Sequence, residues 1–336
     1  MKKTKDSEKD AALTRFYIPE GYESAWPFRK TQIAIKKVKD YFEVALAERL
    51  NLTRVSAPLF VKPGSGLNDN LNGVERPVAF GIKEQNDDIA EIVHSLAKWK
   101  RLALKQYGFH IDEGIYTDMS AIRRDEDTDN LHSIYVDQWD WERIIRKKDR
   151  TITTLKETVR EVYGALRATE GYIYKEYDEI KPILPKRIKF ITAQELEDMY
   201  PDKTPKEREL EIVRKYGAVF LMGIGGALRS GKPHDGRAPD YDDWDLNGDI
   251  IIHYPLLDCA FEISSMGVRV DEVSLARQLK AAGCEDRASL SFQKALLAGE
   301  LPYTIGGGIG QSRICMFFLR KAHIGEVQSS IWPDEV

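Results

Sequence analysis

The stretch YTIGGGIGQSRICMFF, residues 303–318, decides the fold of this chain. It contains four glycines within five residues, followed by Arg313 and a run of apolar side chains. Glycine lets the backbone approach a phosphate closely, and the N-terminus of a following helix attracts the anion. The stretch therefore predicts a phosphate-binding junction between a strand and a terminal helix, with a tight packing turn as the plainer alternative.

Two familiar phosphate-binding motifs do not fit this chain. A dinucleotide-binding fold needs a βαβ unit at the glycines and an acidic residue about 20 positions later. Only 26 residues follow Gly310, which leaves room for one helix and little else. The stretch GALRSGKP, residues 226–233, has the spacing of a P-loop up to its lysine. Pro233 then stands where a Ser or Thr hydroxyl would hold magnesium, so we interpret this match as accidental.

The composition is that of a globular protein and gives no sign of a membrane or secreted protein. The 336 residues are 42% hydrophobic and 31% charged, with a net charge of −4, which is typical of globular proteins. The bulk charge therefore indicates neither a nucleic-acid nor a membrane partner. No apolar run approaches the length of a membrane span, and the N-terminus lacks a signal-peptide core. The three cysteines form no CxxC pair, so we expect free thiols and a cytoplasmic protein.

The pattern of elements predicts an α+β fold. Helices are expected over 31–50, 96–108 (capped by Ser95) and 151–178, and capping boxes at Thr192 and Thr204 begin two shorter helices. Strands are expected over 53–61, 78–80, 115–123, 132–142, 218–225, 249–254 and 260–270. One further strand is expected to end at residue 95. Because strands come in groups rather than in βαβ alternation, we expect an antiparallel β-sheet flanked by helices. We expect residues 1–30 to form a loose N-terminal extension and residues 31–336 a single domain.

A second stretch, AIRRDEDTDNLHSIYVDQWDWE at 121–142, predicts two antiparallel strands joined by an acidic loop. Alternation along the returning strand places Gln138, Asp140 and Glu142 on one face and Trp139 and Trp141 on the other. Buried carboxylates need partners, so such a face is unusual for a core strand. It fits a pocket for a small charged substrate and a metal ion better than a solvated surface, because the same strand begins with apolar residues.

The pattern G-x-G-x-G-x-x-R at 306–313 resembles the third signature motif of class II aminoacyl-tRNA synthetases, and residues 121–142 resemble their second motif. The resemblance implies that Arg313 contacts the terminal phosphate and the adenine of ATP, and that Arg123 contacts the α-phosphate. It also places Glu126 at the adenine and His132 at the far phosphates. The neighbouring Arg124 leaves open which of the two arginines meets the α-phosphate.

Longer motifs make the resemblance more specific. The stretches IVHSLAKWKR, VDQWDWE, RAPDYDDW, LNGDI, FEISSMG and GGGIGQSR occur in this order and resemble the ammonia-dependent asparagine synthetase (aspartate–ammonia ligase) family. The resemblance runs from about residue 30 to the C-terminus. It implies the class II synthetase catalytic fold, a homodimer, and synthesis of asparagine from aspartate, ammonia and ATP. The route it implies passes through a β-aspartyl-adenylate and releases AMP and pyrophosphate.

The same resemblance assigns the site residues. For aspartate it indicates Asp69, Ser95, Lys100, Gln138, Asp140, Asp242 and Ser265. For ATP it indicates Arg123, Glu126, His132, Arg237, Asp249, Glu262, Gly308, Gly310 and Arg313, with Mg²⁺ held by Asp249 and Glu262. The residues expected to be catalytic are Arg123, Arg313, Asp69 and Lys100.

The residue types suit this chemistry. The α-ammonium of aspartate needs carboxylate or amide acceptors, and its α-carboxylate needs cationic or hydroxyl donors. When the β-carboxylate attacks the α-phosphorus, positive side chains and Mg²⁺ cancel the repulsion between two anions. Asp69 is our candidate base for removing a proton from ammonium, and hydrogen bonding within a turn is its rival role.

Two other interpretations stay open from the sequence. An aspartyl-tRNA synthetase-like enzyme would share the stretches RRDED and DQWDWE, although no separate anticodon-binding module is visible. A non-enzymatic synthetase-like scaffold would be indicated by loss of Arg123, Glu262 or Arg313, and all three are present. None of the cysteines has an evident catalytic triad, so free ammonia rather than glutamine is the expected nitrogen source.

Overall fold

The computed structural model describes residues 16–24, 26–71 and 75–333. At its centre is an eight-stranded sheet in the order β1-β5-β6-β11-β10-β9-β8-β7. The inner strands pair antiparallel, whereas β1 lies parallel to β5 and β7 lies parallel to β8. The predicted α+β class with an antiparallel sheet is confirmed. The strands are β1 (Leu52–Arg54), β5 (Gly114–Ile122), β6 (Tyr135–Ile144), β7 (Lys189–Thr192), β8 (Ala218–Met222), β9 (Asp242–Tyr254), β10 (Cys259–Arg269) and β11 (Thr304–Gly310).

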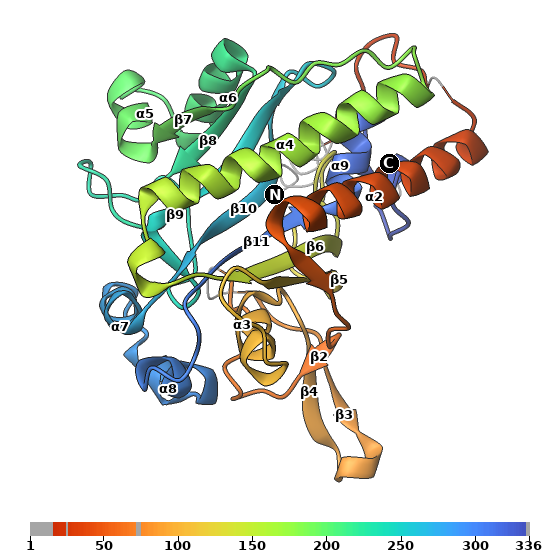
Figure 1. The fold of residues 1–336 in the computed structure, drawn as a ribbon. Coiled ribbons are helices and arrows are strands. Elements are labelled where there is room, and N and C mark those ends of the chain that lie inside the picture. The colour runs from red at the N-terminus through yellow and green to blue at the C-terminus, as the bar shows by residue number, and fades with distance from the viewer. Residues whose placement is uncertain (1–15, 25, 72–74, 334–336) are drawn as a thin grey trace, which may run out of the picture.

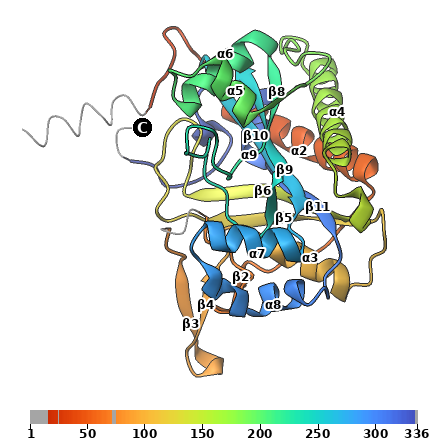
Figure 2. The same cartoon turned by 90° about the vertical axis from the view of Figure 1, so that its left-hand side faces the viewer.

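Helices cover the sheet in separate groups. The long helices α2 (Phe28–Leu50) and α4 (Ile152–Glu176) cross one face side by side (Figure 1). Together with α9 (Gln311–Phe318), they enclose the main core around Trp139 and Trp141 of β6. Helices α5 (Ala193–Met199) and α6 (Pro205–Tyr216) pack on β7, β8 and β9. Figure 2 shows α3 (Ala97–Gln106), α7 (Glu272–Ala281) and α8 (Ser291–Leu297) gathered at the opposite end of the molecule from α5 and α6.

Several local predictions need correction. The expected strand 53–61 is two short strands in different sheets, because Pro58 lacks a backbone N–H and cannot donate a hydrogen bond to a ladder. Its second part, β2 (Phe60–Val61), joins β4 (Asp88–Ile92) and β3 (Ala79–Ile82) in a small sheet that projects from the body (Figure 1). Ser95 is not the N-cap of α3, since Leu96 holds that place without a side-chain cap. Both predicted capping boxes are confirmed.

The described part of the N-terminal extension is attached to the body. The Tyr17 N–H donates to the Asn130 side chain over 2.8 Å, and the Trp26 indole donates to Glu179 over 2.8 Å. Trp26 is buried in the main core, so these residues are not loose. Residues 1–15 of the expected extension lie outside the described residues, and the division into an extension and one domain stays a prediction.

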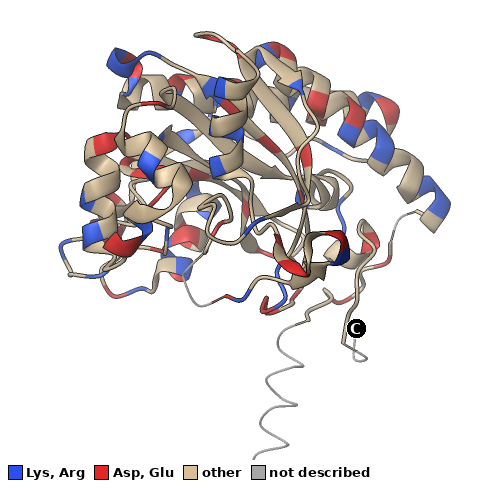
Figure 3. Ribbon diagram, turned by 90° about the horizontal axis from the view of Figure 1, so that it is seen from below, with Lys and Arg blue, Asp and Glu red and all other residues tan. Residues whose placement is uncertain are grey.

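The surface has charges of both signs. Acidic and basic residues are interspersed along the helices (Figure 3), in keeping with the small net charge of −4. Among the residues described, no helix is long and apolar enough to cross a membrane. All three cysteines are unpaired thiols.

Candidate active site

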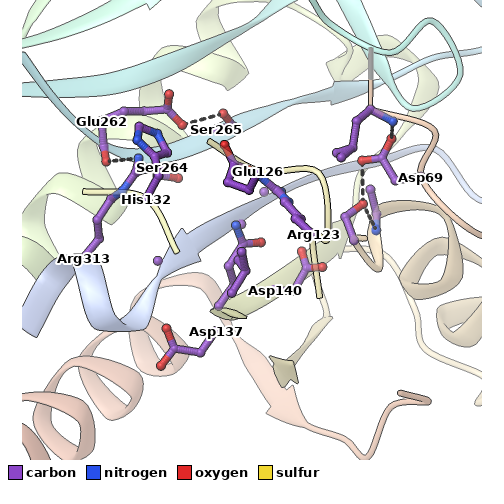
Figure 4. A pocket seen from close by; sticks show the side chains of 18 of the residues that line it. Asp69, Arg123, Glu126, His132, Asp137, Asp140, Glu262, Ser264, Ser265 and Arg313 are labelled. Atoms are coloured by element: carbon purple, nitrogen blue, oxygen red, sulfur yellow. Dashed lines mark hydrogen bonds and ion pairs between the residues drawn. The ribbon is translucent and has the colours of Figure 1, made fainter. Parts of the chain in front are cut away.

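A cavity of about 510 Å³ opens over the middle of the large sheet. It lies on the face of β6 that carries Gln138 and Asp140, opposite the buried Trp139 and Trp141, as the alternation predicts. The predicted site residues that line it are Asp69, Ser95, Arg123, Glu126, His132, Gln138, Asp140, Arg237, Asp242, Glu262, Ser265, Gly308, Gly310 and Arg313 (Figure 4).

Lys100 and Asp249 are the predicted site residues that do not line the cavity. Each lies behind a residue that does. The Lys100 ammonium forms an ion pair with Asp140, and the Asp249 carboxylate accepts a hydrogen bond from Arg237 over 2.5 Å. Both side chains are buried, and each contacts the cavity lining through its partner.

The glycine-rich stretch is a strand rather than a loop. Gly306, Gly308 and Gly310 alternate on β11, and α9 begins directly after them. A methyl group on Gly306 would collide with the Glu142 carboxylate, and one on Gly308 would come within 2.5 Å of the Gln138 side-chain oxygen. The glycines therefore clear space on the cavity face for the polar side chains of β6. The predicted strand–helix junction is correct, but the stretch has no phosphate-cradling loop.

Register explains why distant motifs meet in the cavity. Asp140 on β6 lies directly opposite Gly308 on β11, which lies opposite Ser265 on β10, which lies opposite Asp249 on β9. Directly opposed residues of neighbouring strands point to the same face of a sheet. One row across four strands thus joins the VDQWDWE, GGGIGQSR, FEISSMG and LNGDI motifs.

Asp69 is fixed at one end of the cavity, away from Arg313 (Figure 4). Its carboxylate accepts the Leu71 N–H at 2.8 Å and the Ser95 hydroxyl at 2.9 Å, and its side chain is buried. The turn-forming role is therefore present, and the carboxylate still faces the cavity. Burial raises the pKa of the neighbouring Tyr241 well above its usual value, and the charge of Asp69 adds to this rise.

A buried network of charges supports the cavity floor. The Arg269 guanidinium donates to both Glu142 oxygens at 3.0 Å and also pairs with Asp242. Burial acts to raise the pKa of Glu142, but the charges of Arg269 and Lys100 outweigh it and hold this pKa below the usual value. Burial lowers the pKa of Lys100 against the opposing charge of Asp140.

Arg269 also lines the cavity, and the sequence reasoning missed it. Its signal was an arginine between two valines, Val268 and Val270, directly after FEISSMG.

The opposite end of the cavity is rich in cations. Arg313, in the first turn of α9, donates to the backbone carbonyl of Glu262 over 3.0 Å. Arg123 lines the cavity whereas Arg124 is exposed, which favours Arg123 as the residue that faces a ligand. Lys206 near the start of α6 also lines the cavity and was missed, because a lysine in a capping box looks like an ordinary surface residue.

Glu262 and Asp249 form the predicted metal-binding pair. Burial raises the pKa of Asp249 to about 6, and the nearby Glu262 charge opposes its ionisation as well. Burial would also raise the pKa of Glu262, but Arg313 and Lys206 hold it below the usual value. No group of three or more His, Cys, Asp or Glu side chains among the described residues is arranged to hold a metal ion. Two carboxylates suit Mg²⁺, which takes its remaining ligands from phosphates and water.

The chain is similar to known proteins over nearly its whole length. A family model described as aspartate-ammonia ligase matches residues 29–336. The chain is 63% identical over 324 residues to an aspartate–ammonia ligase of Clostridium perfringens, and the match covers 96% of each chain. It is 65% identical over 318 residues to the enzyme of that name from Ruminiclostridium cellulolyticum, with 95% of each chain covered.

Solved structures of tRNA synthetases share the fold. An asparaginyl-tRNA synthetase from Pyrococcus horikoshii complexed with asparaginyl-adenylate matches with a TM-score of 0.68 at 17% identity, covering 95% of this chain and 76% of that one. An aspartyl-tRNA synthetase from Entamoeba histolytica matches with a TM-score of 0.60 at 15% identity, covering 96% of this chain and 65% of the other. At these identities the similarity shows the fold alone, and it confirms the class II synthetase catalytic fold.

Proposed function

Because the chain belongs to the aspartate–ammonia ligase family and makes asparagine from aspartate and ammonia, we propose that it activates the β-carboxylate of aspartate as an adenylate. ATP is the co-substrate in this proposal, and AMP and pyrophosphate are the other products. One observation carries it: Arg123 and Arg313, one from each predicted phosphate motif, face the same cavity as Asp69, Ser95 and their polar neighbours.

The two ends of the cavity divide the work of the first step. The Gln138 amide oxygen and the Asp140 carboxylate accept hydrogen bonds from the α-ammonium of aspartate. Arg269 donates hydrogen bonds to its α-carboxylate. Arg123 lies at the α-phosphate and stabilises the charge that develops there when the β-carboxylate attacks. Arg313 and His132 hold the outer phosphates, so that pyrophosphate leaves in line with the attack.

Asp249 and Glu262 are the side chains that we propose to hold Mg²⁺. Glu262 lines the cation-rich end, where the phosphates of ATP would bind, and Asp249 lies behind it, paired with the lining residue Arg237. Bound magnesium would neutralise part of the phosphate charge. Arg237, which donates to Asp249, keeps that carboxylate turned toward the cavity wall.

In the second step, neutral ammonia attacks the activated acyl group. Asp69 is the candidate group that attracts ammonium and accepts its proton, because its carboxylate faces the cavity from the end away from Arg313. The Leu71 N–H and the Ser95 hydroxyl hold the carboxylate in place.

We also propose a cytoplasmic homodimer with no nucleic-acid partner. The family resemblance supports the dimer. The unpaired thiols suit the cytoplasm, and the interspersed acidic and basic residues suit a protein without a nucleic-acid partner. Sedimentation equilibrium should give twice the chain mass of 38.4 kDa. A single species at the mass of one chain would contradict the dimer.

A product assay tests the adenylate route. With aspartate, ATP, Mg²⁺ and ammonium, we expect the purified protein to form asparagine, AMP and pyrophosphate in equal amounts. With aspartate but no ammonium, it should exchange labelled pyrophosphate into ATP, since adenylate formation is reversible. Formation of ADP and phosphate would instead mean phosphoryl transfer. Charging of tRNA with aspartate would favour the synthetase-like alternative.

A further inference from the structure

The loop between β5 and β6 is anchored at Asn130. This side chain is buried, and all of its polar groups have partners. Its amide nitrogen donates to the carbonyl of Tyr17 over 2.6 Å and to the carbonyl of Ala322 over 2.7 Å. Its side-chain oxygen accepts the Tyr17 N–H at 2.8 Å. One amide therefore joins the loop to segments near both ends of the chain.

Further contacts strengthen the same junction. The Asn130 carbonyl accepts the Ile324 N–H at 2.9 Å, and the Ser133 hydroxyl contacts the Ser330 hydroxyl at 2.9 Å. The C-terminal segment also reaches the cavity itself, since Ile324 and Gln328 line it. The segments around Tyr17 and around residues 322–330 thus both contact the loop and hold it in place.

The anchored loop carries three side chains that line the cavity, and Figure 4 shows His132 beside Arg313 at its cation-rich end. Arg123, Glu126 and His132 all come from this loop and line the cavity. Next to the anchor, the Asp129 carboxylate accepts the His132 N–H at 2.8 Å and contacts its ring Nδ1 at 2.9 Å. A shift of the backbone at Asn130 would therefore also move Asp129 and the His132 ring that it contacts.

We propose that Asn130 is a positioning residue for nucleotide binding. The segment around Tyr17 supports the nucleotide site as well, because it holds Asn130 and thereby the loop. The inference rests on the proposed function, because it takes this end of the cavity to be the ATP site. Asn130 itself does not line the cavity, so it acts through the loop.

The expected effect follows from population arithmetic. A ligand that binds only one loop arrangement has an apparent Kd equal to its intrinsic Kd divided by the fraction of molecules in that arrangement. Three of the hydrogen bonds that hold the native loop arrangement come from one buried amide. If their loss leaves about one molecule in ten in that arrangement, the Kd for ATP rises about tenfold.

The experiment compares Asn130→Ala and Asn130→Asp with the wild type. Aspartate at 130 keeps the size and one acceptor but loses the donors, and it places a charge against two carbonyls. Binding of Mg·ATP is measured by calorimetry without aspartate, together with KM for ATP and kcat in the full reaction. We expect Kd and KM for ATP to rise about tenfold in both variants, with a much smaller change in kcat at saturating ATP.

Glu170→Gln is the matched control for a loss of stability. Glu170 is also buried and also fastens a distant segment, since its carboxylate accepts the N–H groups of Ile183 and Leu184. We expect this variant to melt at a lower temperature while its Kd for ATP stays unchanged. An unchanged Kd in both Asn130 variants, or an equal rise in Glu170→Gln, would overturn the inference.

A pair of deletions tests the same contact with Asn130 intact. Deletion of residues 1–20 removes Tyr17, whereas deletion of residues 1–15 keeps it and is the reference. The longer deletion should bind Mg·ATP about tenfold more weakly than the shorter one, and equal affinities would refute the role of the Tyr17 segment. Because binding is measured without turnover, a product assay that excludes the adenylate would leave this test valid.

Discussion

Replacing Arg313 with alanine is expected to slow asparagine formation by at least about a hundredfold, comparable to removing one donor to a transition-state charge. Arg313 is in the first turn of α9, and its guanidinium reaches the cavity beside Glu262. The helix is held instead by its buried apolar side chains, among them Ile314 and Phe317. The variant should therefore keep its fold while losing phosphate binding.

Arg320→Ala is the matched control for this prediction. Arg320 follows the same helix, but it donates to the carbonyls of Phe317 and Lys181 and does not line the cavity. We expect its loss to affect melting more than turnover. Steady-state rates and melting temperatures of both variants should be measured together. A near-normal rate for Arg313→Ala would leave the glycine-rich strand and its helix with a packing role only.

The local parts of the site could be predicted because they follow from strand alternation and short-range capping. Alternation along residues 132–142 is enough to place Gln138 and Asp140 opposite the two buried tryptophans, and the structure agrees. The capping boxes of α5 and α6 depend only on residues three apart, and both formed. The antiparallel class followed from the grouping of strands.

The parts that no local pattern predicts depend on contacts between distant segments. No pattern within one strand shows that Asp140 and Ser265 lie on either side of Gly308, since that depends on the pairing of β6, β11 and β10. The same holds for Arg269, whose partners Glu142 and Asp242 lie on other strands. The role of the glycines as space for Glu142 and Gln138 could not be predicted either, because these side chains belong to another strand.

Asp69→Asn is expected to leave adenylate formation nearly intact while slowing amide formation by about a hundredfold or more, the usual range for loss of a general base. Asparagine keeps an oxygen for the Leu71 N–H and places its amide nitrogen toward the Ser95 hydroxyl, which can accept as well as donate. The turn should therefore survive, and only the charge and the capacity to take a proton are lost.

The two half-reactions separate the roles of Asp69. Pyrophosphate exchange needs only aspartate, ATP and magnesium, whereas asparagine formation needs ammonia as well. If Asp69 held the ammonium of the substrate aspartate instead, both rates would fall together, because a poorly bound aspartate slows activation too. Asp69→Ala provides the comparison, since it removes the turn contacts along with the charge. A fall in both assays for alanine, but only in amide formation for asparagine, is the pattern that a proton-accepting carboxylate requires. Equal losses in both assays for Asp69→Asn would refute the base and make Asp69 a binding residue.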